Sequence, residues 1–177
     1  MGRVESLLLS TSQSVVELRG WDVHLLCEHG LDLPDAPLRE NQQVKIYVAS
    51  RFKNAGLVKA FSTKLMTLVP EYECIQTWTD EADKIAAGEL GCPAWQAAEQ
   101  DLKELDEADA IIVLTENCEQ VPGGMHFETG YAYAKGKRVI VIGPETHVFH
   151  HIPRIHHHKN VQAFFIWVMN LRSAARL

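Results

Sequence analysis

The sequence predicts an open, doubly wound α/β sheet from residue 44 onward. Two apolar runs without polar interruption, Ala110–Leu114 (AIIVL) and Val139–Ile142 (VIVI), are typical of parallel strands that are buried on both faces. Segments with apolar residues at helical spacing separate these runs from each other and from further strand-like segments. Regular alternation of strands and helices is the pattern of an α/β domain with a parallel sheet.

The first half of this region supplies two strands and a helix. Val44–Ala49 (VKIYVA) is short, apolar and β-branched, which favours a buried strand. Asn54–Leu68 has the helical spacing, and Pro70 ends that helix. Tyr72–Trp78 is predicted as the second strand.

The second half continues the alternation. Asp80–Ala87 is expected to form a short helix or turn, and a longer helix is expected from Pro93 to about Glu107. Gly124–Lys135 supplies the helix between the two apolar runs, and Val161–Leu171 the last helix. This order favours the flavodoxin-like sheet, in which ligands bind beyond the carboxyl ends of the strands.

Residues 1–43 differ from the rest and are interpreted as an N-terminal extension, so that the α/β domain comprises residues 44–177. Hydroxyl-bearing residues are dense near the start, and Leu33–Pro37 (LPDAP) is a loop signature. Leu7–Leu9 is too short an apolar run for a signal peptide or a membrane span. No membrane association is therefore expected.

Charge and cysteine usage narrow the class of partner and the compartment. The net charge is −6 and no dense Lys/Arg run occurs, which disfavours a nucleic-acid partner. A small anionic ligand stays compatible, because one or two local cations or backbone N–H groups hold it. The four cysteines are scattered without a C-x-x-C pair, so we expect reduced thiols in a cytoplasmic protein rather than a zinc site.

Three segments are expected to meet at the carboxyl edge of the sheet. Tyr47, Ser50 and Arg51 lie on or after the first strand. Asp101 lies on the helix before AIIVL, where a solvated charge is the alternative. Glu128 follows a glycine pair on a mostly apolar helix, so it either performs a task or is a surface residue favoured by the helix dipole.

Histidines gather in residues 147–158 and admit two interpretations. Neutral imidazole is a common metal ligand, but no cysteine accompanies the histidines, and adjacent residues of an extended segment point in opposite directions. A polar loop in which one histidine contacts substrate or a neighbouring subunit is preferred. We expect neither a metal nor an organic cofactor; a flavin is disfavoured because no clear phosphate loop follows the first strand.

Several segments in the correct order resemble the nucleoside 2-deoxyribosyltransferase family and the related nucleoside 5′-monophosphate N-glycosidases. The resemblance covers about residues 44–143, is weaker through Val148–Pro153, and has no counterpart in residues 1–43. The matching segments are Ile46–Ser50 (IYVAS), Asp101-Leu102, Ala108–Val113 (ADAIIV), Gly124–Ala132 (GMHFETGYA) and Lys135–Val141 (KGKRVIV).

The resemblance implies an enzyme that cleaves or transfers at the N-glycosidic bond of a (deoxy)nucleoside or nucleotide. Glu128 would attack C1′ of the sugar, Asp101 would handle the proton of the base, and Tyr47 would position the nucleophile. A glycosidic bond chemically requires such a pair, one carboxylate as nucleophile and one acid for the leaving group. Small-molecule nucleosides, nucleotides and nucleobases are the partners implied, and family members assemble into homo-oligomers.

One departure affects the substrate. The family commonly has a sugar-binding aspartate six residues before the nucleophile, where this chain has Pro122. Ser50 and Arg51 resemble a phosphate-holding pair, while Gly123, Gly124 and Met125 would complete the binding surface. A hydrolase of nucleoside 5′-monophosphates and a non-catalytic nucleotide-binding module on the same fold both stay open as alternatives.

Overall fold

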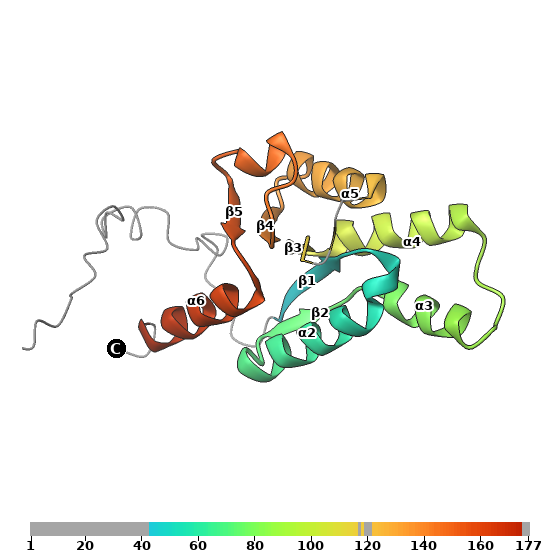
Figure 1. Ribbon diagram of the computed structural model, residues 1–177, viewed down its shortest axis with the longest axis horizontal. Helices are drawn as coiled ribbons and strands as arrows, with labels where there is room; N and C mark the ends of the chain where they lie inside the picture. The colour runs from blue at the N-terminus through green and yellow to red at the C-terminus, as the bar shows by residue number, and fades with distance from the viewer. Residues whose placement is uncertain (1–42, 117, 119–121, 175–177) are drawn as a thin grey trace, which may run out of the picture. The chain divides into compact units, whose positions relative to one another are not determined.

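The computed structural model describes residues 43–116, 118 and 122–174 (Figure 1). Within them a parallel sheet has the strand order β2–β1–β3–β4–β5. This order confirms the predicted flavodoxin-like, doubly wound sheet. Residues 1–42 of the predicted extension lie outside the described residues. The strands are β1 (Val44–Ala49), β2 (Tyr72–Cys74), β3 (Ala110–Leu114), β4 (Arg138–Ile142) and β5 (Ile155–His158).

α-Helices connect the strands from β1 to β4, as the sequence pattern indicates, and a short 3-10 helix lies between β4 and β5. The α-helices are α2 (Ala55–Leu68), α3 (Trp78–Ala86), α4 (Ala94–Glu107), α5 (Gly123–Ala134) and α6 (Val161–Ala174), and two short 3-10 helices are η1 (Phe52–Asn54) and η2 (Val148–His151). No helix among the described residues is long and apolar enough to cross a membrane.

The two faces of the sheet are covered by different helices (Figure 1). On one face, α4 and α5 pack through Leu105, Met125 and Ala132 against Tyr47 and Ile111 of the central strands. On the other face, Phe61 of α2 packs against Phe164 and Phe165 of α6, with ring centroids 5.6 and 5.3 Å apart. The central strand β3 is therefore buried on both sides, which explains why its sequence lacks polar residues.

Two elements differ from the prediction. The second strand ends at Cys74 rather than Trp78, because the chain turns into α3 at Trp78. The histidine-rich segment is not wholly a polar loop, since Ile155–His158 forms the edge strand β5 beside β4. The sequence did not predict this strand, because its three consecutive histidines lack the apolar alternation by which a half-buried strand is recognised.

Gly143 allows β4 to end close to its neighbours. Its φ of +119° lies in a region that other residues rarely adopt, and an added Cβ would lie 2.5 Å from the amide nitrogen of Glu116. The Gly143 amide donates to the carbonyl of His158, and its carbonyl accepts from the ring of His157. This glycine therefore joins the end of β4 to β5.

The aromatic residues of α6 serve the core. Phe164 and Phe165 are buried, whereas Met169 is exposed. Packing within the domain therefore explains the two phenylalanines but not Met169. The homo-oligomer stays a prediction.

Candidate functional site

The centre of the candidate site is a hydrogen bond between Tyr47 and Glu128. Tyr47 lies on β1 with its side chain on the sheet face that α4 and α5 cover, and it is fully buried. Its hydroxyl donates to Oε1 of Glu128 over 3.0 Å. Residues 81 positions apart in the sequence are thus joined beneath α4 and α5.

Glu128 is held in a poorly solvated position by the helix that carries it. Met125, Thr129 and Ala132 form the buried side of α5, and Glu128 lies at the border of that side. Burial, then the charge of Asp101, raises the pKa of the Glu128 carboxyl from 4.5 to about 7, while the hydrogen bond from Tyr47 acts in the opposite direction. Glu128 is therefore not an ordinary surface glutamate at a helix end.

Asp101 brings a second carboxyl group to the same tyrosine. It lies on the side of α4 that carries the buried Leu105 and Ala108, as the helical spacing predicts. Burial raises the pKa of Asp101 from 3.8 to about 6; the Tyr47 hydroxyl lowers it and the charge of Glu104 raises it. The alternative of a solvated charge does not describe this half-buried side chain.

Tyr47 connects the two carboxyl groups as a neutral donor. Burial, followed by the charges of Glu128 and Asp101, raises the pKa of its phenol well above the ordinary value. The phenol therefore keeps its proton throughout the physiological range. Such a donor stabilises the ionised form of a carboxylate that it contacts.

Two predicted binding residues follow β1. The Ser50 hydroxyl donates to the carbonyl of Leu114 over 3.1 Å and accepts from the amide of Asn54, which ties together the ends of β1 and β3. Arg51 is half-buried, and its charge lowers the pKa of Cys118, although burial of that thiol has the larger, opposite effect. Arg51 thus lies near the segment that follows β3.

The other predicted binding residues begin α5. Gly123 and Gly124 are exposed, and a Cβ at either position would meet nothing within 4 Å. Met125 is buried in the core beside Tyr47. Pro122 precedes the helix without a side-chain hydrogen bond to it. The first amides of a helix have no acceptor within the helix, so they suit an anion.

Sequence reasoning missed the aromatic pair Phe52 and Trp78. The Trp78 indole donates to the carbonyl of Val48, the residue after Tyr47, over 3.0 Å, and its ring lies against the same core cluster. Phe52 is exposed, and its ring centroid is 6.3 Å from that of Trp78. The sequence pattern placed Trp78 at the end of the predicted strand Tyr72–Trp78, so its position at the start of α3 was not expected.

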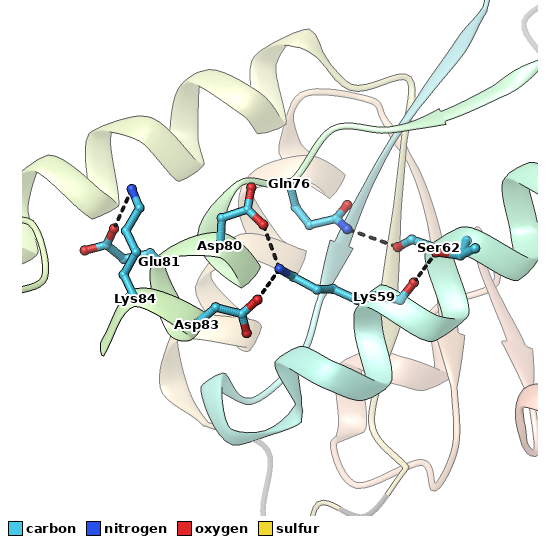
Figure 2. A network of polar contacts seen from close by, with 8 residues as sticks. Lys59, Ser62, Gln76, Asp80, Glu81, Asp83 and Lys84 are labelled. Atoms are coloured by element: carbon cyan, nitrogen blue, oxygen red, sulfur yellow. Dashed lines mark hydrogen bonds and ion pairs between the residues drawn. The ribbon is translucent and has the colours of Figure 1, made fainter. Parts of the chain in front are cut away.

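A polar network fixes α3, the helix that begins with Trp78 (Figure 2). Lys59 of α2 pairs with Asp80 and Asp83 of α3 at 2.7 and 2.5 Å. Gln76 accepts from the amide of Val48 and donates to Ser62, so the segment before α3 is bound to both β1 and α2. The position of Trp78 therefore depends on contacts from three elements.

The histidines pack in a separate cluster against α5. The ring centroids of His126 and His147 are 4.4 Å apart, and His150 lies 6.0 Å from His126. Burial lowers the pKa of His150 and of His126, which keeps both rings neutral. Within the described residues, no three His, Cys, Asp or Glu side chains form a group arranged to hold a metal ion.

No family model matches the sequence, and no curated protein sequence matches it. Among solved structures, the CMP N-glycosidase of Clostridium botulinum matches 70% of this chain and 97% of its own, with 17% identity and a TM-score of 0.48. The 2-deoxyribosyltransferase of Leishmania mexicana matches 56% of this chain and 63% of its own, with 21% identity and a TM-score of 0.44.

The sequence motifs given above resemble the nucleoside 2-deoxyribosyltransferase family and the related N-glycosidases. The two neighbours carry names from the family and the related N-glycosidases that the sequence motifs resemble. The fold assignment itself follows from the strand order and the parallel register.

The raised pKa of Glu128 has a consequence for stability. Between pH 4.5, where the unfolded chain releases this proton, and about 7, the folded protein holds it. The contribution of Glu128 to stability is therefore lost progressively as the pH rises through this window. We expect Glu128→Gln to be more stable than the native protein at pH 8, by about 1–3 kcal/mol, with a much smaller difference at pH 4.5.

Urea unfolding at the two pH values measures this effect. Glu107→Gln, which removes an exposed glutamate of α4, is the control and should change stability by less than about 0.5 kcal/mol at both. A Glu128→Gln protein that is destabilised at pH 8 would contradict the buried carboxyl site.

Proposed function

We propose that the protein cleaves, or transfers at, the N-glycosidic bond of a (deoxy)nucleoside or nucleotide through a glycosyl-enzyme on Glu128. The observation that carries the proposal is the hydrogen bond of 3.0 Å from buried Tyr47 to Glu128, beside a second carboxyl with a raised pKa. A half-buried pair of carboxyl groups supplies the nucleophile and the acid that glycosyl transfer needs. The sequence motifs around the same three residues support this assignment.

In the first step, a Glu128 oxygen forms a bond to C1′ while the bond from C1′ to the base nitrogen breaks. Asp101 donates its proton to the departing base, so the base leaves neutral. In the second step, water or another base attacks C1′, the bond from C1′ to Glu128 breaks, and the proton of the attacking group goes to Asp101. Attack by water is hydrolysis, and attack by another base is transfer.

This chemistry requires Glu128 to be ionised while Asp101 carries a proton. The two groups titrate as a coupled pair near pH 6 and 7, so the singly protonated pair is most abundant between these values. In the free protein the higher pKa of Glu128 places the shared proton on that carboxyl. Positive charge that develops on the sugar beside Glu128 favours its ionised form, so bound substrate moves the proton to Asp101, from which the base receives it.

The aromatic pair offers a surface for the base. Trp78 lies against the core cluster that contains Tyr47, and Phe52 lies beside it with an exposed ring. Nucleobases of every kind stack on aromatic rings, because each base has a π-face. This favours a base-containing substrate over a simple glycoside.

A second candidate function is a nucleotide-binding module without catalysis, and the observation that favours it is Pro122. It stands where the family commonly has a sugar-binding aspartate, and its backbone enters α5 without a side-chain cap. Such a module would bind nucleotides through the same residues but release no base.

Chromatography of purified protein with a panel of deoxynucleosides, ribonucleosides and their 5′-monophosphates tests the proposal. We expect free base, a bell-shaped pH profile of kcat/KM with its maximum between about 6 and 7, and a loss of roughly 10³-fold or more in Glu128→Gln. Adding a second base separates transfer from hydrolysis. Full activity of Glu128→Gln would exclude the mechanism, and an inactive native protein that binds nucleotides would favour the module.

Arg51 is proposed to hold a 5′-phosphate, together with the first amides of α5. Guanidinium binds phosphate oxygens through two parallel hydrogen bonds, and Arg51 lies near the segment after β3. We expect Arg51→Ala to raise KM for monophosphates about 10- to 100-fold and to leave KM for nucleosides nearly unchanged.

The matched control is Arg154→Ala, which removes an exposed arginine that stacks on Tyr133. It should leave both KM values unchanged. Equal increases in KM for both substrate types in Arg51→Ala would show that Arg51 does not bind phosphate.

A further inference from the structure

Glu104 is a buried carboxylate that the mechanism above does not use. Only 5% of it is exposed, although it lies on a helix rich in charged residues. Its oxygens accept from the amide and the hydroxyl of Thr77, at 3.1 and 2.5 Å, and from the side-chain amide of Gln100 at 2.8 Å. These donors are all neutral.

The charge of Glu104 has no ion-pair partner among the described residues. A buried carboxylate costs free energy unless hydrogen bonds or an opposite charge compensate it. The three hydrogen bonds satisfy the oxygens but leave the negative charge in place. That charge acts on whatever ionisable group lies nearby.

One such group is Asp101, three residues earlier on the same helix, whose pKa the charge of Glu104 raises. Residues three apart on a helix lie on the same side, so Glu104 and Asp101 are neighbours on α4. The ionisable groups that face Asp101 are Tyr47 of β1, Glu128 of α5 and Glu104 of its own helix. Among these, Glu104 is not part of the reacting set.

Glu104 also reaches the aromatic pair through Thr77. Thr77 precedes Trp78, the first residue of α3, and Trp78 donates to the carbonyl of Val48 beside Tyr47. A single carboxylate therefore holds the start of α3 against α4, on the side of the sheet where Asp101 lies. Both the proton donor and the aromatic surface are within its reach.

We propose that Glu104 is a positioning residue, which keeps the Asp101 carboxyl supplied with its proton and holds Trp78 in place through Thr77. This inference rests on the proposed function for its catalytic meaning, but the electrostatic link between the two carboxyl groups exists without it. A neutral Glu104 would leave Asp101 ionised at a lower pH. Fewer molecules would then carry the proton that the leaving base needs.

Carbon-detected NMR titration of the Asp101 carboxyl tests the link, with Asp101→Asn used to assign the signal. In Glu104→Gln we expect the pKa of Asp101 to fall by about half a unit or more, because one nearby like charge is removed. The acidic limb of the pH profile of kcat/KM should move to lower pH, because Glu104 raises the pKa of Asp101. An unchanged or raised Asp101 pKa would overturn the proposal.

Three further variants separate charge from structure. Glu99→Gln removes an exposed charge from the same helix and should leave the Asp101 titration unchanged. Thr77→Val removes one hydrogen bond but keeps the charge, so it should raise KM without lowering the Asp101 pKa. If the Asp101 pKa falls as far in Thr77→Val as in Glu104→Gln, the role of Glu104 is merely structural. Glu104→Leu, a neutral residue of similar size, repeats the test if Glu104→Gln does not fold.

The same titration distinguishes failure of this inference from failure of the proposed function. If the native protein releases no base but Asp101 titrates lower in Glu104→Gln, the link stands and the N-glycosidic function fails. If base is released normally but the Asp101 titration and the pH profile do not move, the function stands and the role of Glu104 is wrong.

Discussion

The site depends on one constraint, the burial of two carboxyl groups around a tyrosine that keeps its proton. Tyr47 is fully buried on a central strand and can reach Glu128 only because α4 and α5 pack over that face of the sheet. Little water remains to stabilise the charges, so the pKa values of Asp101 and Glu128 rise toward neutrality. Two groups that would be fully ionised in water can therefore exchange a proton near pH 7.

Such an arrangement costs stability, and the rest of the domain compensates for it. The aromatic packing of Phe61, Phe164 and Phe165 lies on the opposite face of the sheet, away from the carboxyl pair. Strand β3 (Ala110–Leu114), which lies between these two layers, has no polar side chain. An apolar layer beneath the site surrounds Tyr47, while the two carboxyl groups above it are poorly solvated, which is a common compromise between stability and function.

Much of this could be predicted from the sequence, and the exceptions have physical reasons. The apolar runs β3 and β4 and the helical spacing of α2 and α4 identified the fold, because burial on both faces leaves a clear pattern. Strand β5 was missed because His156, His157 and His158 lack that pattern. The sequence does not distinguish Glu104 from the other charged residues of α4, since spacing alone does not show which of them faces Thr77. The roles of Glu128, Asp101 and Tyr47 come from the family resemblance and stay predictions; the structure adds the hydrogen bond between Tyr47 and Glu128.

The most direct test of the central claim is mass spectrometry of the protein after reaction with a 2-fluoro-2-deoxynucleoside, whose fluorine slows release of the sugar from a glycosyl-enzyme. The account predicts that free base appears once per active site and that the peptide containing Glu128 gains the mass of the fluorosugar. The same peptide from Glu128→Gln should gain nothing. A sugar attached to another residue, or base release with no covalent adduct at any time, would contradict the assignment of Glu128 as the nucleophile.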